Sequence, residues 1–293
     1  MTRIGEILAI VAAFVWSANS AITEKKGRGL DAGAINFGRL VIGLIVTTLA
    51  LTLFPAFFGK LPIPADGWWP LLLSGVIGFS IGDTFLFSAF LTIGSRLTML
   101  LYAFSPVLTA VMAYFIFGEK LTPFNLLGIV LVLTGILLVV LQRKPDGTRK
   151  VSPRGILFGF LAAVGQAGGA ILSKLGLQSV DPLTGTQLRV IGGILGMLVI
   201  ITLLRKWPSA RNTFSHPNGK LVILISGVFG TFLGVTLSMW ALKYAKAAVA
   251  STLLALTPIT ILPISAFFLK EKLTAVDILG AVISVAGCAI LFL

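Results

Sequence analysis

The stretch FGEKLTPFNLLG (residues 117–128) recurs as FLKEKLTAVDILG (residues 268–280). Both copies are short charged segments between long apolar runs, and self-similarity of this kind indicates an internal repeat. An offset of 150 residues aligns Asp31 and Arg39 with Asp181 and Arg189. An offset of 152 aligns Gly75 with Gly227, Gly78 with Gly230, Gly82 with Gly234, Pro106 with Pro258, Glu119 with Glu271, Gly128 with Gly280 and Gly135 with Gly287. The chain is therefore interpreted as a duplication.

The composition is that of a membrane protein. Of 293 residues, 57% are hydrophobic and only 11% are charged, with a mean hydropathy of +1.03. A soluble domain is about 25% charged. Several uncharged runs reach 22 or 23 residues, and a helix needs roughly 20 residues to cross a bilayer. Ten spans are predicted, over residues 4–23, 33–55, 68–91, 96–117, 123–141, 154–174, 183–204, 220–241, 247–268 and 275–293.

Five spans in each half determine how the halves are related. After five crossings the chain emerges on the opposite face, so the second half enters the membrane upside down. The sequence thus predicts an all-α polytopic membrane protein with ten transmembrane helices arranged as two inverted five-helix repeats. The first repeat covers residues 1–142 and the second covers residues 154–293, joined by a basic connector over residues 143–153.

The excess of basic residues is explained by topology. The chain has 23 Lys and Arg against 10 Asp and Glu, but the basic residues lie in short loops between apolar spans, which does not favour a nucleic-acid partner. Fifteen fall on one face of the predicted topology and six on the other. Basic loops are retained in the cytoplasm. We therefore expect the connector to be cytoplasmic and both termini external, in a plasma or inner membrane.

In its recurring pattern the chain resembles the EamA-type transporters of the drug/metabolite transporter superfamily. Each half has a polar or aromatic residue in its first span, an arginine in its second, a glycine-rich third, a proline in its fourth and an EKLT segment before its fifth. Residues 78–122 are especially similar to this family. The resemblance covers nearly the whole chain and implies a carrier that exports or imports a small metabolite, such as an amino acid or a related compound.

Charged residues within the spans are the first candidates for a site. A charge inside hydrocarbon costs about 2.5–3.5 kcal/mol on insertion scales, so it usually faces a cavity or a partner. Asp83 lies mid-span and is interpreted either as a site for a coupling proton or cation, or as a carboxylate that bonds a neighbouring helix. Arg39 and Arg189 lie at matching depths. Each either extends to the headgroups or closes a pathway and binds a substrate carboxylate or phosphate.

Polar and aromatic residues in the first spans are further candidates. Trp16 and Asn19 share one face of a helix, and Gln166 aligns with Trp16 in the second half. Their interpretation is cavity lining, with helix-to-helix hydrogen bonds as the alternative. Tyr102, just before Pro106, is assigned to the same substrate site. Because the halves differ here, the site cannot be fully symmetric.

Prolines, glycines and threonines shape the spans. Pro106 and Pro258 remove a backbone donor at equivalent depth, so their helices should bend and are candidates for gates. Glycine pairs such as Gly78 with Gly82 favour close helix packing. Thr122 and Thr274 are predicted helix N-caps, with Glu119 and Glu271 in tight turns at the headgroup level.

No enzyme motif is found. The single histidine, His216, lies in a polar loop, and the chain has neither a metal-ligand cluster nor a phosphate-binding loop nor a nucleophile elbow. No cofactor or metal is expected. The favoured function is secondary transport by rocking of the two halves around a midplane cavity. A lipid-modifying membrane enzyme and a multidrug or cation exporter of the same fold are the alternatives.

Overall fold

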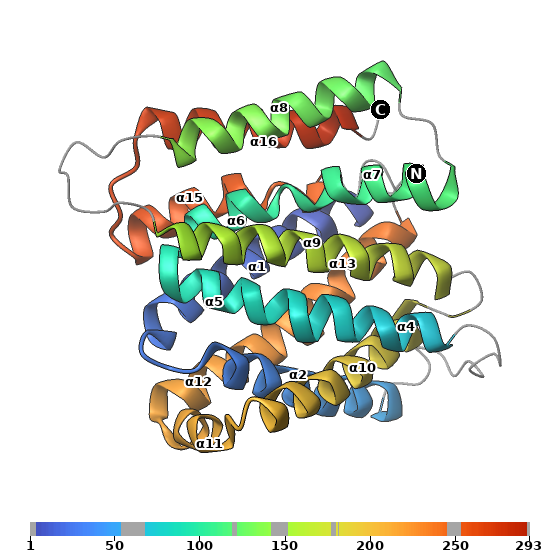
Figure 1. Cartoon of the computed structure of the whole chain (residues 1–293), viewed down its shortest axis with the longest axis vertical. Coiled ribbons are helices and arrows are strands. Elements are labelled where there is room, and N and C mark those ends of the chain that lie inside the picture. The colour runs from blue at the N-terminus through green and yellow to red at the C-terminus, as the bar shows by residue number, and fades with distance from the viewer. Residues whose placement is uncertain are drawn as a thin grey trace.

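The computed structural model describes residues 4–53, 68–118, 122–141, 152–176, 180, 182–244 and 253–291. Within these ranges the chain forms helices joined by turns (Figure 1). In chain order they are α1 (Ile4–Gly27), α2 (Ala32–Leu53), α4 (Trp68–Ser74), η1 (Gly75–Gly82), α5 (Asp83–Ile93), α6 (Ser95–Tyr102), α7 (Ser105–Phe117), α8 (Pro123–Val140), α9 (Pro153–Gly176), α10 (Pro182–Leu203), α11 (Trp207–Ser215), α12 (Pro217–Ile225), η2 (Ser226–Gly234), α13 (Val235–Tyr244), α15 (Thr257–Phe268) and α16 (Ala275–Leu291).

The predicted spans coincide with these helices to within a few residues wherever the structure describes both ends. Eight helical segments in the described ranges are long and apolar enough to cross a membrane, counting α4–η1–α5, α6–α7 and α12–η2 with the start of α13 as continuous segments. Two shorter apolar helices, Thr257–Phe268 and Ala275–Ile290, complete the set. The count of ten spans therefore stays a prediction.

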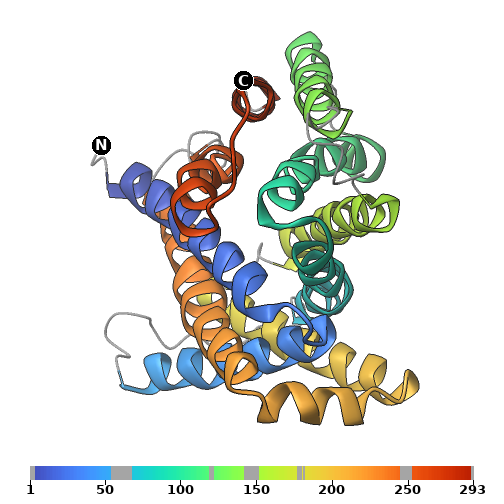
Figure 2. The ribbon, with the colours of Figure 1, turned by 90° about the vertical axis from the view of Figure 1, so that its left-hand side faces the viewer.

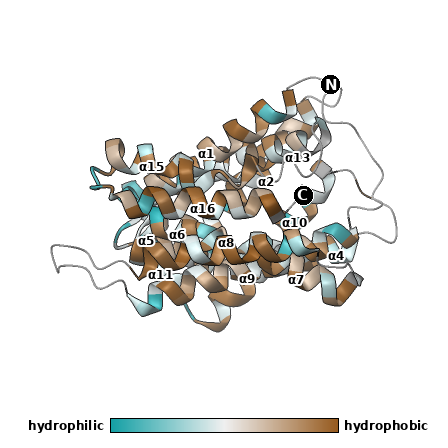
Figure 3. Ribbon diagram, turned by 90° about the horizontal axis from the view of Figure 1, so that it is seen from above, coloured by the Kyte–Doolittle hydropathy of each residue, from teal (hydrophilic) through white to brown (hydrophobic). Residues whose placement is uncertain are grey.

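The outer surface of the bundle is apolar, as a lipid environment requires. Figure 3 shows that hydrophobic residues make up most of the helices. Large side chains among them are strongly exposed, including Phe115 at 78%, Leu203 at 76% and Phe267 at 86%. A water-soluble protein rarely exposes contiguous apolar surface on this scale.

Helices of the two repeats are interleaved. α1 contacts α12, η2, α13 and α15, and we call this group the first arm. α9 contacts α4, η1, α5, α6 and α7, which form the second arm. Figure 2 shows the arms diverging from α2 and α10, which contact each other below them. Each arm thus combines the first helix of one repeat with helices of the other, and the repeats are not separate bodies.

α8 and α16, which are equivalent in the repeat, pack against each other in antiparallel directions. A Cβ added at Gly135 would lie 2.5 Å from the Gly280 carbonyl oxygen, and one added at Gly287 would lie 2.8 Å from that of Gly128. The repeat aligns Gly128 with Gly280 and Gly135 with Gly287. The contact of Gly135 with Gly280 is therefore equivalent to the contact of Gly287 with Gly128, with the roles of the two repeats exchanged. Only glycine allows the two backbones to approach this closely at these positions.

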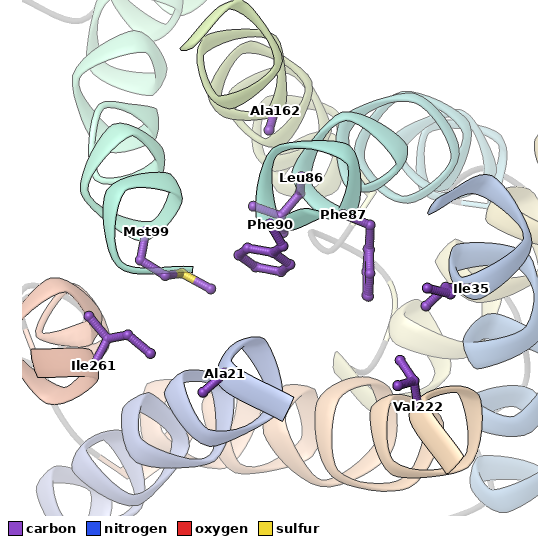
Figure 4. Close-up of a cluster of buried hydrophobic side chains, with 9 residues drawn as sticks. All are labelled: Ala21, Ile35, Leu86, Phe87, Phe90, Met99, Ala162, Val222 and Ile261. Carbon is purple, nitrogen blue, oxygen red and sulfur yellow. The ribbon is translucent and has the colours of Figure 1, made fainter. Parts of the chain in front are cut away.

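A buried apolar cluster lies where the arms converge near the end of α1. Figure 4 shows its side chains, which come from α1, α2, α5, α6, α9, α12 and α15. The cluster consists of Ala21, Ile35, Leu86, Phe87, Phe90, Met99, Ala162, Val222 and Ile261. Because its members come from both arms, it joins them.

Helix starts follow the predicted capping. The Thr122 hydroxyl accepts a hydrogen bond from the Asn125 amide at 3.2 Å, and the Thr274 hydroxyl accepts one from the Asp277 amide at 3.2 Å. Glu119 lies outside the described residues. One element was not expected: α11 forms in the polar loop, and His216 after it caps α12 by accepting a hydrogen bond from the Asn218 amide.

Candidate functional site

A buried ion pair joins α2 to the start of α5. The Arg39 guanidinium donates to the Asp83 carboxylate, and the two side chains are 8% and 10% exposed. The Arg39 Nε also donates to Asn36 Oδ1 at 3.0 Å, and its Nη1 donates to the Thr231 hydroxyl at 2.9 Å. The guanidinium lies over the Phe87 ring, 5.0 Å from its centre. Arg39 therefore points into the protein and does not extend to the headgroups.

Asn36 fixes the orientation of this pair. It lies one helical turn before Arg39, and its amide nitrogen donates to the Phe79 carbonyl at 2.7 Å and to the Thr84 hydroxyl at 2.9 Å. Those bonds turn its carbonyl oxygen toward Arg39. Thr231 is held in turn by its bond to the Ser226 carbonyl at 3.3 Å. A polar network inside a bundle is stable when its members satisfy one another in this way.

Two π-helical stretches bring the backbones together at the site. η1 and η2 occupy equivalent positions in the repeat, and π-helical turns occur frequently at functional sites. A Cβ added at Gly227 would lie 3.1 Å from the Arg39 carbonyl oxygen, and Gly75 makes the equivalent contact with the Arg189 carbonyl. The contacts of Gly75 and Gly227 place each arginine against the π-helix of the opposite repeat. The close packing predicted at Gly82 is confirmed, because a Cβ added there would lie 3.2 Å from the Gly165 backbone.

Arg189 differs from Arg39 in its surroundings. Its side chain is buried, with the residue 8% exposed, and its guanidinium stacks over Phe79, 4.5 Å from the ring centre. Its Nε is buried and has no hydrogen-bond partner. Among the described residues no ion pair involves Arg189, although the carboxylate of Asp83 is close enough to act on its charge. The Arg39–Asp83 pair and Arg189 thus both lie beside Phe79, whereas Tyr102 is partly buried and packs against the apolar cluster.

The first-span candidates lie on interfaces between helices. Trp16 and Asn19 of α1 face η2: a Cβ at Gly234 would meet the Trp16 ring, and one at Gly230 would lie 3.0 Å from Asn19 Nδ2. The Asn19 Oδ1 atom is buried and has no hydrogen-bond partner. Gln166 of α9 lies beside Gly82, with its backbone nitrogen 3.3 Å from a Cβ built there. These residues flank the π-helices, next to the charged group.

The helix is interrupted directly before both candidate prolines. Residues 103–104 form a turn between α6 and α7, with Pro106 in the first turn of α7. Residues 255–256 form the equivalent turn, with Pro258 in the first turn of α15. Proline at position 258 cannot bond the Leu254 carbonyl, which instead accepts from the Thr257 hydroxyl at 3.0 Å. The predicted distortion is present in both repeats.

A second polar group joins the arms where α1 ends. Glu24 is 2% exposed and accepts hydrogen bonds from the Ser95 amide at 2.7 Å and the Ser95 hydroxyl at 2.8 Å. Arg96 forms ion pairs with Glu271 and Asp277. Glu271 therefore does more than shape a turn, because it links α6 to the segment before α16.

Several of these partners escaped the sequence analysis. Asn36 could have been found from its position three residues before Arg39, on the same helical face. Thr231 and Phe79 carry no signal by themselves, since they align with each other in the repeat and look like ordinary span residues. Among the described residues, no group of three His, Cys, Asp or Glu side chains could hold a metal ion.

The fold and the buried charges define a polytopic helical membrane protein with a polar centre between two arms. The sequence model of the EamA-like transporter family matches residues 3–141 and again residues 153–293, and the chain belongs to this family. This assignment confirms the family resemblance that the sequence pattern indicated.

Similar proteins come from distant organisms. The human solute carrier family 35 member G1 is 27% identical over 237 residues, which cover 78% of this chain and 62% of the relative. The WAT1-related protein At3g02690, chloroplastic, of Arabidopsis thaliana is 23% identical over 250 residues, covering 83% of this chain and 60% of the relative. The chain therefore spans only about three-fifths of these two relatives.

Relatives of more similar length are also named as transporters. The uncharacterized transporter YoaV of Bacillus subtilis is 25% identical over 195 residues, covering 67% of this chain and 65% of the relative. One crystal structure of a protein 16% identical in sequence superposes on 99% of this chain and 96% of its own, with a TM-score of 0.66, and so shares the fold. The transporter names agree with the expectation that the chain is not an enzyme.

The buried ion pair predicts a specific stability pattern. Asp83→Asn leaves the Arg39 charge buried with a neutral partner, and breaking a buried pair typically costs about 3–5 kcal/mol. The double variant Arg39→Gln with Asp83→Asn removes both charges and should recover much of that loss. Thermal unfolding in detergent measures both effects, with Glu6→Gln at an exposed position as the control. Equal melting temperatures for Asp83→Asn and wild type would contradict a stabilising pair.

Proposed function

We propose that the chain is a secondary transporter that carries a small metabolite, such as an amino acid or a related compound, across the cytoplasmic membrane by alternating access. The observation that supports this most directly is the buried charged group of Arg39, Asp83 and Arg189 between two arms of an internally duplicated bundle. Charges inside a membrane protein usually mark a substrate or ion pathway.

We also propose ten spans in two inverted repeats. The eight long helical segments, together with α15 and α16, supply five helices to each repeat. The antiparallel, reciprocal contact of α8 with α16 supports an axis that lies in the membrane plane, because such an axis reverses the direction of a crossing helix. The repeats would then cover residues 1–142 and 154–293, with the connector 143–153 in the cytoplasm and both termini outside.

Inversion predicts where the two EKLT segments lie. Lys120 and Lys272 are equivalent in the repeat and should lie on opposite sides of the bilayer. Single cysteines at 120 and 272, in a Cys288→Ala background, are labelled with a membrane-impermeant thiol reagent in intact cells and in inverted vesicles. We expect the cysteine at 272 to react only from the cytoplasmic side and the one at 120 only from outside. Labelling of both from one side would refute the inverted arrangement.

The moving units of the proposed mechanism are the two arms. Each arm contains helices of both repeats. A rigid rotation of one repeat against the other would therefore break the contacts that α1 and α9 make with helices of the opposite repeat. The Glu24–Ser95 hydrogen bonds, the ion pairs of Arg96 and the apolar cluster around Phe90 join the arms at one end. We assign these contacts to a closed gate on the side where α1 ends. The breaks at Pro106 and Pro258 are the proposed hinges.

The gate predicts a change in accessibility. Met99→Cys in a Cys288→Ala background places a thiol in the buried cluster behind the gate. With Glu24→Gln and Arg96→Gln added, this thiol should react severalfold faster with an impermeant reagent applied from the side where α1 ends, because the contacts between the arms are weakened. Arg154→Gln, an exposed charge deletion at that end, is the control. Equal rates in all three proteins would exclude a gate at this position.

Transport itself is tested in proteoliposomes. Purified protein is reconstituted, and uptake of labelled amino acids and related metabolites is measured with and without an imposed proton gradient. We expect saturable uptake that Arg39→Ala and Asp83→Asn each reduce at least tenfold, with gradient-driven uptake lost in Asp83→Asn if Asp83 binds the coupling proton. Unchanged flux in both variants would remove these residues from the pathway. Absence of flux for every metabolite would overturn the proposed function.

A further inference from the structure

The repeat allows the surroundings of Arg39 and Arg189 to be compared position by position. Three side chains accept hydrogen bonds from the Arg39 guanidinium: Asn36, Thr231 and Asp83. The offsets of 150 and 152 residues place Thr186, Phe79 and Val235 at the equivalent positions around Arg189. Two of the three acceptors are therefore replaced by side chains that cannot accept a hydrogen bond, and the single carboxylate is lost.

The contacts of Thr231 and Phe79 agree with this comparison of the two repeats. Thr231 bonds Arg39 across the interface between repeats, and its equivalent Phe79 lies under Arg189 across the corresponding interface. Phe79 covers one face of the guanidinium and leaves its edge, which carries all the N–H donors, without an acceptor from that residue. The Nε of Arg189 is buried without a partner.

The charge balance points the same way. Arg39 and Asp83 neutralise each other in direct contact, while Arg189 interacts with Asp83 only electrostatically. The described residues of this group thus carry one positive charge in excess. A buried cation with free donors in a fixed fork is suited to a carboxylate or phosphate.

We propose that Arg189 binds the anionic group, carboxylate or phosphate, of a small organic anion, and that the Asp83-to-Val235 difference between the repeats creates this subsite. The inference rests on the proposed transport function and specifies its substrate class. Arg39 is excluded as the anion ligand because its guanidinium is already paired with the Asp83 carboxylate. The same pairing makes Asp83 a poor site for a cationic drug, which weighs against the cation-exporter alternative.

The test restores the missing carboxylate. Val235→Asp places an acid where the repeat predicts contact with Arg189, and α10 and α13 are in contact. The new carboxylate should form an ion pair with Arg189, as Asp83 does with Arg39, and thereby compete with the anionic group of the substrate. Val235→Asn has nearly the same size without the charge and is the matched control. Arg189→Gln removes the cation, and Arg189→Lys keeps it.

Binding is measured by thermal shift and flux by uptake into proteoliposomes. The probes are succinate and glutamate as carboxylates, glycerol 3-phosphate as a phosphate ester, choline as a cation and glycerol as a neutral compound. We expect an anion to stabilise and to cross, with affinity reduced roughly 10- to 100-fold by Val235→Asp and by Arg189→Gln. Val235→Asn should retain most of it, while Arg189→Lys, which keeps the charge but lacks the planar fork, should retain only part of it. Whether a carboxylate or the phosphate ester is preferred identifies the anionic group.

A folding control keeps the result interpretable. If Val235→Asp pairs with Arg189, its melting temperature without ligand should exceed that of Val235→Asp combined with Arg189→Gln, where the new acid has no cation. The reverse order would overturn the predicted contact. Flux of choline or glycerol alone, or anion flux that Arg189→Gln leaves unchanged, would overturn the anion subsite while leaving the transporter intact. No flux of any probe together with no thermal shift by any anion would reject both.

Discussion

The structure depends on the close approach of helix backbones at paired glycines. Hydrophobic burial provides little driving force between helices that are already in lipid, so contact area at short range must hold the bundle together. Gly75 against the Arg189 backbone, Gly227 against the Arg39 backbone, and the reciprocal contacts of α8 with α16 are all of this kind. Because each contact joins one repeat to the other, the same constraint that stabilises the bundle also interleaves the halves.

Interleaving places the two buried arginines at the interface between repeats, where small sequence differences change their chemistry. Arg39 finds Asp83 in its own repeat and Thr231 in the other, while Arg189 finds Phe79. The backbone arrangement is close to symmetric, but the charge distribution is not. A duplicated protein can thus keep a backbone with near two-fold symmetry and still form a binding site that is asymmetric, as most small molecules are.

The helices and the candidate charges followed from the sequence because both rest on strong local signals. Apolar runs of helical length predict spans, and a charge within such a run is conspicuous, so Arg39, Asp83 and Arg189 were identified. Their pairing was not predictable. The repeat aligns Asp83 with Val235 but does not reveal that Asp83 meets Arg39, 44 positions away. Thr231 was missed because it comes from the other repeat, and the π-helical form of η1 and η2 has no clear signature beyond their glycines.

The interleaving of the repeats also bears on how the protein is made. α1 ends at residue 27, but its neighbour α12 begins only at residue 217. At 5–20 residues per second, that interval corresponds to roughly 10–40 s of synthesis. During this time the polar face around Asn19, which packs against η2 in the finished structure, is already in the bilayer without the second repeat. Membrane insertion of the first helix therefore has to precede its final packing, and the nascent chain must shield this polar face until η2 has been synthesised.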